Sequence, residues 1–236
     1  MKIKPLMTAV CLFSLYAVAE DSYNKKFESM QPTKCDNLYL KRVKAFKNWN
    51  KTAPKGGLVL LGDSITQGFP EKQAPKEWKL SARGIAGDGV GGGKFRGLIN
   101  RLDVSCNNLA PSKVFIKIGI NDIRNSDEEQ VRIPLKTRLD SYREIIRSLK
   151  KNNKTIEIYL SSILPTRGKY AFRNKEVREV NTLLKQLAEK EKINYFDLGK
   201  AFLVNGEMNP ELTKDDIHLN AKGYKIWIRE LHKIMK

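Results

Sequence analysis

Residues 57–68 read Gly-Leu-Val-Leu-Leu-Gly-Asp-Ser-Ile-Thr-Gln-Gly, an apolar run followed by a polar turn. A short apolar run bounded by glycines predicts a strand that is buried on both faces. The turn then puts Ser64 where a strand passes into a helix. A serine there presents its hydroxyl at the sheet edge, beside backbone N–H groups that stabilise negative charge. Serine also caps helices, so the turn alone does not establish a function.

Further apolar runs and helical patterns extend outward from this stretch. Predicted strands lie at 80–85, 114–118, 156–161 and 193–196. Predicted helices, in which apolar residues recur every three or four positions, lie at 38–49, 135–149, 177–187 and 224–235. Strands that alternate with helices predict an α/β fold, with a parallel sheet of about five strands covered by helices on both faces, in one domain.

Ligands of such a sheet bind beyond the carboxyl ends of its strands, so the segment after the second strand is informative. Residues 84–94 are rich in glycine, which lets backbone N–H groups approach a ligand closely. Gly87, Gly89 and Gly92 fit the pattern G-x-G-x-x-G, but they do not follow the first strand and no acid stands about 20 residues further on. The phosphate-loop pattern fails because Phe95 follows Lys94. We therefore do not expect nucleotide binding.

Two other segments place polar groups at the same edge. Asn121 follows the third strand, where a carboxamide donates an N–H or serves as an ordinary turn residue. Asp215 and His218 precede the last predicted helix, and their spacing lets the carboxylate fix the tautomer of the imidazole. The other histidine, His232, lies among Lys and Glu residues and is expected to be a solvated helix residue.

Taken together, Gly62-Asp63-Ser64, Gly87, Gly119-x-Asn121 and Asp215-x-x-His218 resemble the four blocks of the SGNH hydrolase family, the GDSL-like esterases and lipases. The resemblance runs from about residue 57 to the C-terminus. It is closest to the branch of platelet-activating-factor acetylhydrolase catalytic subunits and secreted bacterial esterases. It implies a flavodoxin-like three-layer α/β/α sandwich, with Ser64 as nucleophile, His218 as general base and Asp215 orienting it. The oxyanion hole would consist of the backbone N–H groups of Ser64 and Gly87 and the side chain of Asn121.

The chain departs from the family pattern in two places. Asp216 stands where relatives often carry Gly, which puts a second carboxylate beside the predicted Asp215–His218 pair. Residues 86–90 read Ala-Gly-Asp-Gly-Val where relatives of this branch often read Gly-Gly-Asp-Thr-Thr, so the loop around Gly87 is expected to be more flexible.

The resemblance implies a carboxylic ester hydrolase that forms an acyl-enzyme intermediate and needs no cofactor or metal. The sequence contains no long apolar lid, which favours a short acyl group such as acetyl, on a carbohydrate. A lysophospholipase, a thioesterase and an acyltransferase would use the same triad, and a non-catalytic polyanion-binding module is a further alternative. The substrate rim is expected at Asp63, Arg83, Asp88, Arg124 and Arg167. The basic residues there, with Lys94, Lys169 and Arg173, would suit an anionic saccharide.

Composition limits the remaining classes. The 236 residues include 44 Lys and Arg against 26 Asp and Glu, a net charge of +18. An apolar fraction of 41% excludes a fully disordered chain, and 3 Cys are too few for a disulfide scaffold. Only 2 His argue against a His-rich metal site. The charge predicts attraction to polyanions, but most Lys and Arg fall on polar helix faces, where a solvated surface is the ordinary explanation.

Residues 1–19 have the pattern of a secretory signal peptide. Lys2 and Lys4 precede an apolar run, too short to span a membrane, that ends in Ala-Val-Ala at 17–19. We expect a periplasmic or extracellular domain at 20–236, without a lipoprotein anchor at Cys11, without a transmembrane segment and without nucleic acid as a partner. An oxidising compartment permits, but does not require, a Cys35–Cys106 disulfide. The sequence leaves the oligomeric state open.

Overall fold

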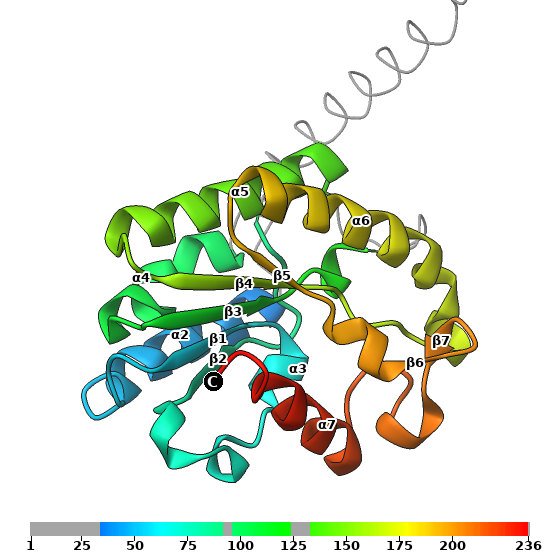
Figure 1. The fold of residues 1–236 in the computed structure, drawn as a ribbon, viewed down its shortest axis with the longest axis horizontal. Coiled ribbons are helices and arrows are strands. Elements are labelled where there is room, and N and C mark those ends of the chain that lie inside the picture. Colours follow the sequence, from blue (N-terminus) through cyan, green and yellow to red (C-terminus); the bar gives the residue numbers. More distant parts are fainter. Residues whose placement is uncertain (1–33, 92–95, 124–132, 236) are drawn as a thin grey trace, which may run out of the picture.

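The computed structural model describes residues 34–91, 96–123 and 133–235, and a parallel sheet lies at its centre (Figure 1). Across the sheet, the strands are β2 (Ser81–Gly84), β1 (Leu58–Gly62), β3 (Lys113–Lys117), β4 (Glu157–Ser161) and β5 (Asn194–Phe196). Every neighbouring pair is parallel. This strand order is the flavodoxin-like one, in which the chain reverses its direction across the sheet between β1 and β3. The predicted fold class and the five predicted strands are confirmed.

Helices cover both faces of this sheet. They are α2 (Lys34–Trp49), α3 (Ser64–Gln67), α4 (Leu102–Ser105), α5 (Leu135–Asn152), α6 (Asn174–Lys190) and α7 (Ala221–Leu231). In Figure 1, α5 and α6 lie on one face of the sheet, and α3 and α7 lie on the other. A hairpin of two short strands, β6 (Leu203–Val204) and β7 (Glu207–Met208), lies between β5 and α7 in the chain. The result is a three-layer α/β/α sandwich.

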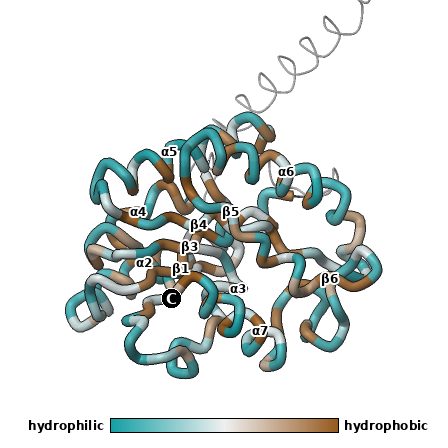
Figure 2. Tube along the Cα trace, viewed as in Figure 1, coloured by the Kyte–Doolittle hydropathy of each residue, from teal (hydrophilic) through white to brown (hydrophobic). Residues whose placement is uncertain are grey.

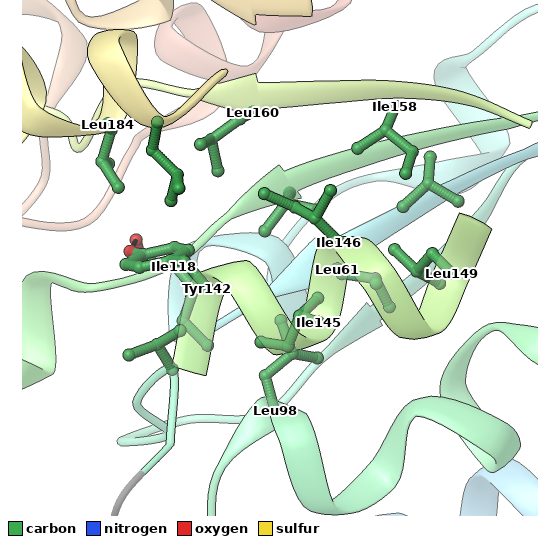
Figure 3. Close-up of a cluster of buried hydrophobic side chains, with 14 of the residues drawn as sticks. Leu61, Leu98, Ile118, Tyr142, Ile145, Ile146, Leu149, Ile158, Leu160 and Leu184 are labelled. Carbon is green, nitrogen blue, oxygen red and sulfur yellow. Dashed lines mark hydrogen bonds between the residues drawn. The ribbon is translucent and has the colours of Figure 1, made fainter. Parts of the chain in front are cut away.

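The side chains of β1 show why the sequence forms three layers. Val59 and Leu61 belong to the hydrophobic cluster under α5 and α6, part of which Figure 3 shows, whereas Leu58 and Leu60 belong to the cluster on the α7 side. All four are at most 2% exposed. Successive side chains of a strand point to opposite faces, so a continuous apolar run is the pattern of a strand covered on both sides. Each fully buried aliphatic side chain stabilises the fold by about 1.5–3 kcal/mol.

The long helices turn one apolar stripe toward the sheet. In α5, Tyr142, Ile145, Ile146 and Leu149 are buried, at the three- and four-residue spacing of a helix face. The outer sides of α5 and α6 are largely hydrophilic, while the strands between them and α7 are hydrophobic (Figure 2). The helices predicted at 135–149 and 177–187 are confirmed as α5 and α6.

The last helix ends earlier than predicted. The spacing of apolar residues predicts a helix through residue 235, but α7 ends at Leu231. The chain then tightens into turns in which the N–H groups of Lys233 and Ile234 donate to carbonyls three residues earlier. Ile234 remains buried, so the apolar pattern continued past the end of the helix. His232 is exposed, and its ring also packs edge-on against Trp78 at 4.7 Å.

Cys106 is a free thiol in the core, with 0% exposure. Burial raises the pKa of this thiol to about 12. The possible disulfide is therefore not formed at Cys106, and the Cys35 side chain lies outside what the structure describes. The predicted signal peptide, residues 1–19, and Cys11 also lie outside the described residues. None of the helices within the described ranges combines the length and apolarity required to span a bilayer.

Candidate functional site

Ser64 is the first residue of α3, directly after β1. Asp63 caps this helix, because its side chain accepts the Ile65 N–H at 2.9 Å. The turn before it is tight: a Cβ on Gly62 would lie 2.0 Å from Thr66 Oγ1 and 2.3 Å from the Lys117 carbonyl. Only glycine fits there without displacing the backbone of β3. The Gly-Asp-Ser sequence thus fixes the direction in which Ser64 leaves the sheet.

A buried ion pair lies beneath the Ser64 turn. Lys117 Nζ, at the end of β3, is 3.2 Å from both carboxylate oxygens of Asp63. The two side chains are 1% and 0% exposed. Burial lowers the pKa of Lys117, against the opposing effect of the nearby Asp63 carboxylate. The pair joins the end of β3 to the turn that carries Ser64.

His218 meets Ser64 from a distant part of the sequence. Its Nε2 lies 2.9 Å from Ser64 Oγ, and its Nδ1 lies 2.8 Å from Asp215 Oδ2. Asp215 also accepts the backbone N–H of His218 at 2.7 Å. A hydroxyl, an imidazole and a carboxylate in this order let the carboxylate fix the tautomer that leaves Nε2 free to accept the hydroxyl proton. The structure therefore brings together the three residues that the sequence predicts as catalytic.

The Asp215–His218 turn lies at the surface. The side chains of Asp215 and His218 are 47% and 33% exposed. Partial burial acts to raise the pKa of Asp215, but the hydrogen bonds from the His218 backbone and ring outweigh it, so this pKa lies below its ordinary value. The carboxylate remains charged beside the imidazole at neutral pH. A negative charge at this position stabilises an imidazolium.

Asp216, which follows Asp215, has an unusual backbone. Its φ is 73°, in the left-handed region that favours glycine. Its backbone carbonyl accepts the Arg167 N–H at 3.1 Å, and its side chain lies 3.3 Å from Arg167 Nη1. The two contacts join the Asp215–His218 turn to the segment after β4.

The predicted oxyanion donors lie in two neighbouring loops. Asn121 Nδ2 donates to the Asp88 carbonyl at 2.9 Å, which puts the carboxamide beside the loop that holds Gly87. Gly87 has a φ of +72°, a conformation that glycine adopts without strain. The Ile85 N–H donates to the Gly62 carbonyl at 3.1 Å, so the glycine loop starts directly beside the Ser64 turn. Ser64, Gly87 and Asn121 thus belong to loops that hydrogen bonds connect at one edge of the sheet.

A buried arginine, which the sequence analysis missed, holds these loops together. Arg101 is 2% exposed and donates to the Asp88 carboxylate, the Arg83 and Gly62 carbonyls and Ser105 Oγ, at 2.8–2.9 Å. It therefore joins the ends of β1 and β2 to the glycine loop. Burial raises the pKa of Asp88 to about 6, against the opposing effect of Arg101. The sequence signal for Arg101 is a cation close to Leu98, Ile99 and Leu102.

Asp122 is a second residue that the sequence analysis missed. It is buried, and its carboxylate accepts the Val90 N–H at 3.1 Å. A Cβ on Gly89 would lie 2.3 Å from this carboxylate. Asp122 therefore packs directly against the glycine loop from the loop that carries Asn121. Its position next to Asn121 in the sequence was the available signal.

The predicted substrate rim is wrong at three positions. Asp63, Arg83 and Asp88 are at most 2% exposed, so they cannot line a surface that a substrate reaches. Asp63 and Asp88 pair with buried cations, and the Arg83 guanidinium lies near the ring of Phe46 at 5.4 Å. Arg167 is at the surface, with 37% of its side chain exposed. Arg124 and Lys94 lie outside the described residues. Among the described residues, no three His, Cys, Asp or Glu side chains gather into a metal-binding group.

Comparison with known proteins agrees with this geometry. Residues 60–226 match the GDSL-like lipase/acylhydrolase family. The chain belongs to this family. The match begins within β1, and it contains β2 to β5 and all three members of the Ser64–His218–Asp215 chain. As a GDSL-like acylhydrolase, the protein is a carboxylic ester hydrolase.

Solved structures share the fold of this acylhydrolase. A Streptococcus pneumonia protein described as a candidate platelet activating factor superimposes with a TM-score of 0.74 at 22% identity, over 93% of this chain and 99% of that one. A variant of an acetyl-xylooligosaccharide esterase from Geobacillus gives a TM-score of 0.60 at 20% identity, over 78% of this chain and 95% of that one.

One curated relative matches the acylhydrolase in part. N-acylneuraminate cytidylyltransferase of Escherichia coli O18:K1:H7 is 29% identical over 125 residues, which are 52% of this chain and 28% of the relative. The chain thus spans little more than a quarter of that protein.

Proposed function

We propose that this acylhydrolase removes a short acyl group, such as acetyl, from a carbohydrate through an acyl-enzyme intermediate. The hydrogen-bonded chain from Ser64 Oγ to His218 Nε2 at 2.9 Å, and from His218 Nδ1 to Asp215 at 2.8 Å, is the observation that supports the mechanism. It contains a nucleophile, a base within reach of the nucleophile's proton, and a group that orients the base.

The first half of the reaction transfers the acyl group to the enzyme. Ser64 Oγ attacks the ester carbonyl while His218 Nε2 accepts the hydroxyl proton, and the bond to the leaving alcohol breaks as His218 protonates that oxygen. Water then repeats the sequence on the acyl-enzyme, which releases the acid and restores the Ser64 hydroxyl. Asp215 stabilises the imidazolium in each half without taking its proton.

The oxyanion that forms on the carbonyl oxygen needs donors already in position. The N–H groups of Ser64 and Gly87 and the Asn121 carboxamide are the proposed donors. The buried contacts of Arg101, Lys117 and Asp122 support their arrangement, because donors held in place need no reorganisation as the charge develops. Removal of one such donor costs about 3 kcal/mol of barrier in comparable sites.

The surroundings of Ser64 favour a small acyl group. The Tyr224 hydroxyl donates to the Ile65 carbonyl at 2.8 Å, and its oxygen would lie 2.4 Å from a Cβ on Gly68. A bulky ring thus packs against α3, close to the nucleophile. Gln67 accepts the Ala86 N–H at 2.9 Å, which connects the end of α3 to the glycine loop. The fold shared with the Geobacillus acetyl-xylooligosaccharide esterase is consistent with an acetyl group on a sugar.

A series of p-nitrophenyl esters of increasing acyl length tests this function. We expect the highest kcat/KM with acetate and no detectable turnover by Ser64→Ala. Ser148→Ala, which removes a hydroxyl on the outer side of α5, is the matched control and should retain full activity. Unchanged activity of Ser64→Ala would exclude Ser64 as nucleophile. A preference for eight or more carbons would exclude the short-acyl specificity. A sugar ester as the main product when a sugar acceptor is added to the assay would indicate an acyltransferase.

The proposed site of action is outside the cytoplasm. The support is the basic start, apolar run and Ala-Val-Ala ending of residues 1–19. Expression of the full chain with a tag at the C-terminus, followed by fractionation and N-terminal sequencing, tests it. We expect an exported product that begins near Glu20, and an intact cytoplasmic chain would contradict the proposal.

A further inference from the structure

The segment between β4 and α6 forms a shelf of cations and aromatic rings. We use the name shelf for Arg167, Lys169, Tyr170, Phe172 and Arg173. Lys169 Nζ lies 5.1 Å from the Tyr170 ring centroid, and the Arg173 guanidinium lies 5.3 Å from Tyr170 and 5.5 Å from Phe172. Phe172 is 48% exposed, although large apolar side chains are ordinarily covered. An exposed ring among cations indicates a binding surface better than scattered lysines do.

The shelf is held directly beside the Asp215–His218 turn. The backbone and side-chain contacts of Arg167 with Asp216 attach its first residue to that turn. Asn174 closes its other end: the Thr166 N–H donates to Asn174 Oδ1, and Asn174 Nδ2 donates to the Thr166 carbonyl, both at 2.8 Å. Asn174 is buried, so these two hydrogen bonds hold the two ends of the segment that carries the shelf. The shelf therefore begins next to the turn that carries His218, the residue that would protonate the leaving alcohol.

A cavity continues from the shelf. It has a volume of about 610 Å³ and lies between α6, the segment after β5 and the β6–β7 hairpin. Figure 1 shows this hairpin beside the start of α6. Three cations, Arg178, Lys185 and Lys200, line the cavity with one carboxylate, Asp197. Asn174, the residue directly after the shelf, lines it too, so the cavity begins next to the shelf.

We infer that the shelf and the cavity bind an extended acidic polysaccharide whose ester is cleaved at Ser64. This inference rests on the proposed function and names the class of its alcohol component. Arg167, Lys169 and Arg173 belong to the shelf and three more cations line the cavity, against two carboxylates, Asp216 beside Arg167 and Asp197 in the cavity. Several sugar carboxylates along one chain complement this excess of cations, whereas a single small anion would pair with one of them. The exposed ring of Phe172 and, in the cavity, Tyr195 supply apolar ring surface for the faces of the sugars.

An anionic membrane is the rival partner for basic residues near exposed Phe172, Leu203 and Val204. The observations favour the polysaccharide, because the cations lie over the rings of Tyr170 and Phe172 and because further cations line the neighbouring cavity. Membrane-binding surfaces instead present apolar side chains that insert between lipids, outside the ring of cations.

Calorimetric titration of the Ser64→Ala protein tests the inference without turnover. The probes are polygalacturonate, neutral xylan, and vesicles of phosphatidylglycerol and phosphatidylcholine. We expect polygalacturonate to bind at least tenfold more tightly than xylan, with an affinity that falls as salt is added. Two double variants remove cations from the shelf and from the cavity: Lys169→Gln/Arg173→Gln and Lys185→Gln/Lys200→Gln. Each should weaken polygalacturonate binding about five- to tenfold, because each loses two ion pairs with the polysaccharide.

Lys136→Gln/Lys222→Gln is the matched control. It removes the same charge from lysines that are 73% and 70% exposed on α5 and α7. Its binding should equal that of the parent protein, and thermal unfolding should show that all the variants are folded. An equal loss of binding in the control would mean that the effect comes from net charge alone. Binding to vesicles but not to polygalacturonate would identify a membrane as the partner. Either result overturns the inference, while the ester assay of Ser64→Ala decides the proposed function separately.

Discussion

The turn that carries Ser64 packs against buried ion pairs, whereas the turn that carries His218 lies at the surface. Asp63, Lys117, Asp88 and Arg101 are at most 2% exposed and connect three strands. The Asp215 side chain is 47% exposed and is held by the residues that follow it. Buried charges are tolerated only when each one is paired, and removal of one partner leaves the other buried and unpaired. Substitutions in the buried pairs beneath Ser64 should therefore lower the stability of the protein. Substitutions in the exposed turn that carries His218 should lower activity and leave stability unchanged.

The largest expected effect is on activity, at the exposed turn. Asp215→Asn should lower kcat for p-nitrophenyl acetate about 10⁴-fold, because an amide at this position favours the wrong imidazole tautomer. The free energy of unfolding should change by no more than about 0.5 kcal/mol, since the side chain is exposed and Asn keeps an acceptor for the backbone N–H groups. Urea denaturation and steady-state kinetics on one preparation measure both. A large loss of stability would remove the contrast between the turns.

The next effect is on stability, at the buried side. Arg101→Met should lower the free energy of unfolding by about 3–5 kcal/mol, because the Asp88 carboxylate and two backbone carbonyls lose their buried partner. Arg147→Met is the control: Arg147 pairs with Glu191 but is 65% exposed, and its loss should cost less than about 1 kcal/mol. Equal losses in the two variants, measured by urea denaturation, would mean that burial does not set the contribution of these pairs.

The two carboxylates should also respond to pH in opposite directions. Burial raises the pKa of Asp88 from 3.8 to about 6, so between these values the folded protein holds a proton that the unfolded chain has lost. The Asp88 contribution to stability is present below pH 3.8 and decreases as the pH rises toward 6. The pKa of Asp215 is lowered, so its contribution is present above pH 4 and is lost in more acidic solution.

Comparing unfolding free energies from pH 3 to 7 for Asp88→Asn and for Asp215→Asn isolates the two contributions. In Asp88→Asn the decrease in stability between pH 3.8 and about 6 should be absent, and in Asp215→Asn the loss of stability below pH 4 should be absent. Each variant should retain the pH dependence that comes from the other carboxylate. Parallel pH profiles for both variants would contradict the opposite shifts.

The smallest effect is expected at Asp216. Asp216→Gly relieves a left-handed backbone at φ 73° but removes the partly exposed ion pair with Arg167. Relief of the backbone strain should stabilise the protein by about 1–2 kcal/mol. Loss of the ion pair should destabilise it by about 0–1 kcal/mol. The net result in thermal unfolding should lie between no change and a stabilisation of about 2 kcal/mol. A loss greater than 2 kcal/mol would show that the histidine turn depends on this pair.

The sequence predicts the sheet and the residues around Ser64 for a common reason. Strands buried on both faces appear as continuous apolar runs, and the polar groups directly after them are aligned by the sheet itself. Asp63, Arg83 and Asp88 were misplaced at the rim because charged side chains are almost never buried unless they are paired. Such pairing joins residues far apart in the chain: Lys117 and Asp63 are separated by 54 positions. Local patterns contain no sign of such a partner.

The hydrogen bond between Ser64 and His218 closes a loop of 154 residues. Between the two lie four of the five parallel strands, each joined to the sheet through a crossover. Closing so long a loop before these strands dock costs chain entropy, so we expect the bond to form late in assembly. Recovery of esterase activity after dilution from denaturant should thus lag behind the recovery of helical circular dichroism. Ester hydrolysis would then report a late step of folding that circular dichroism does not detect.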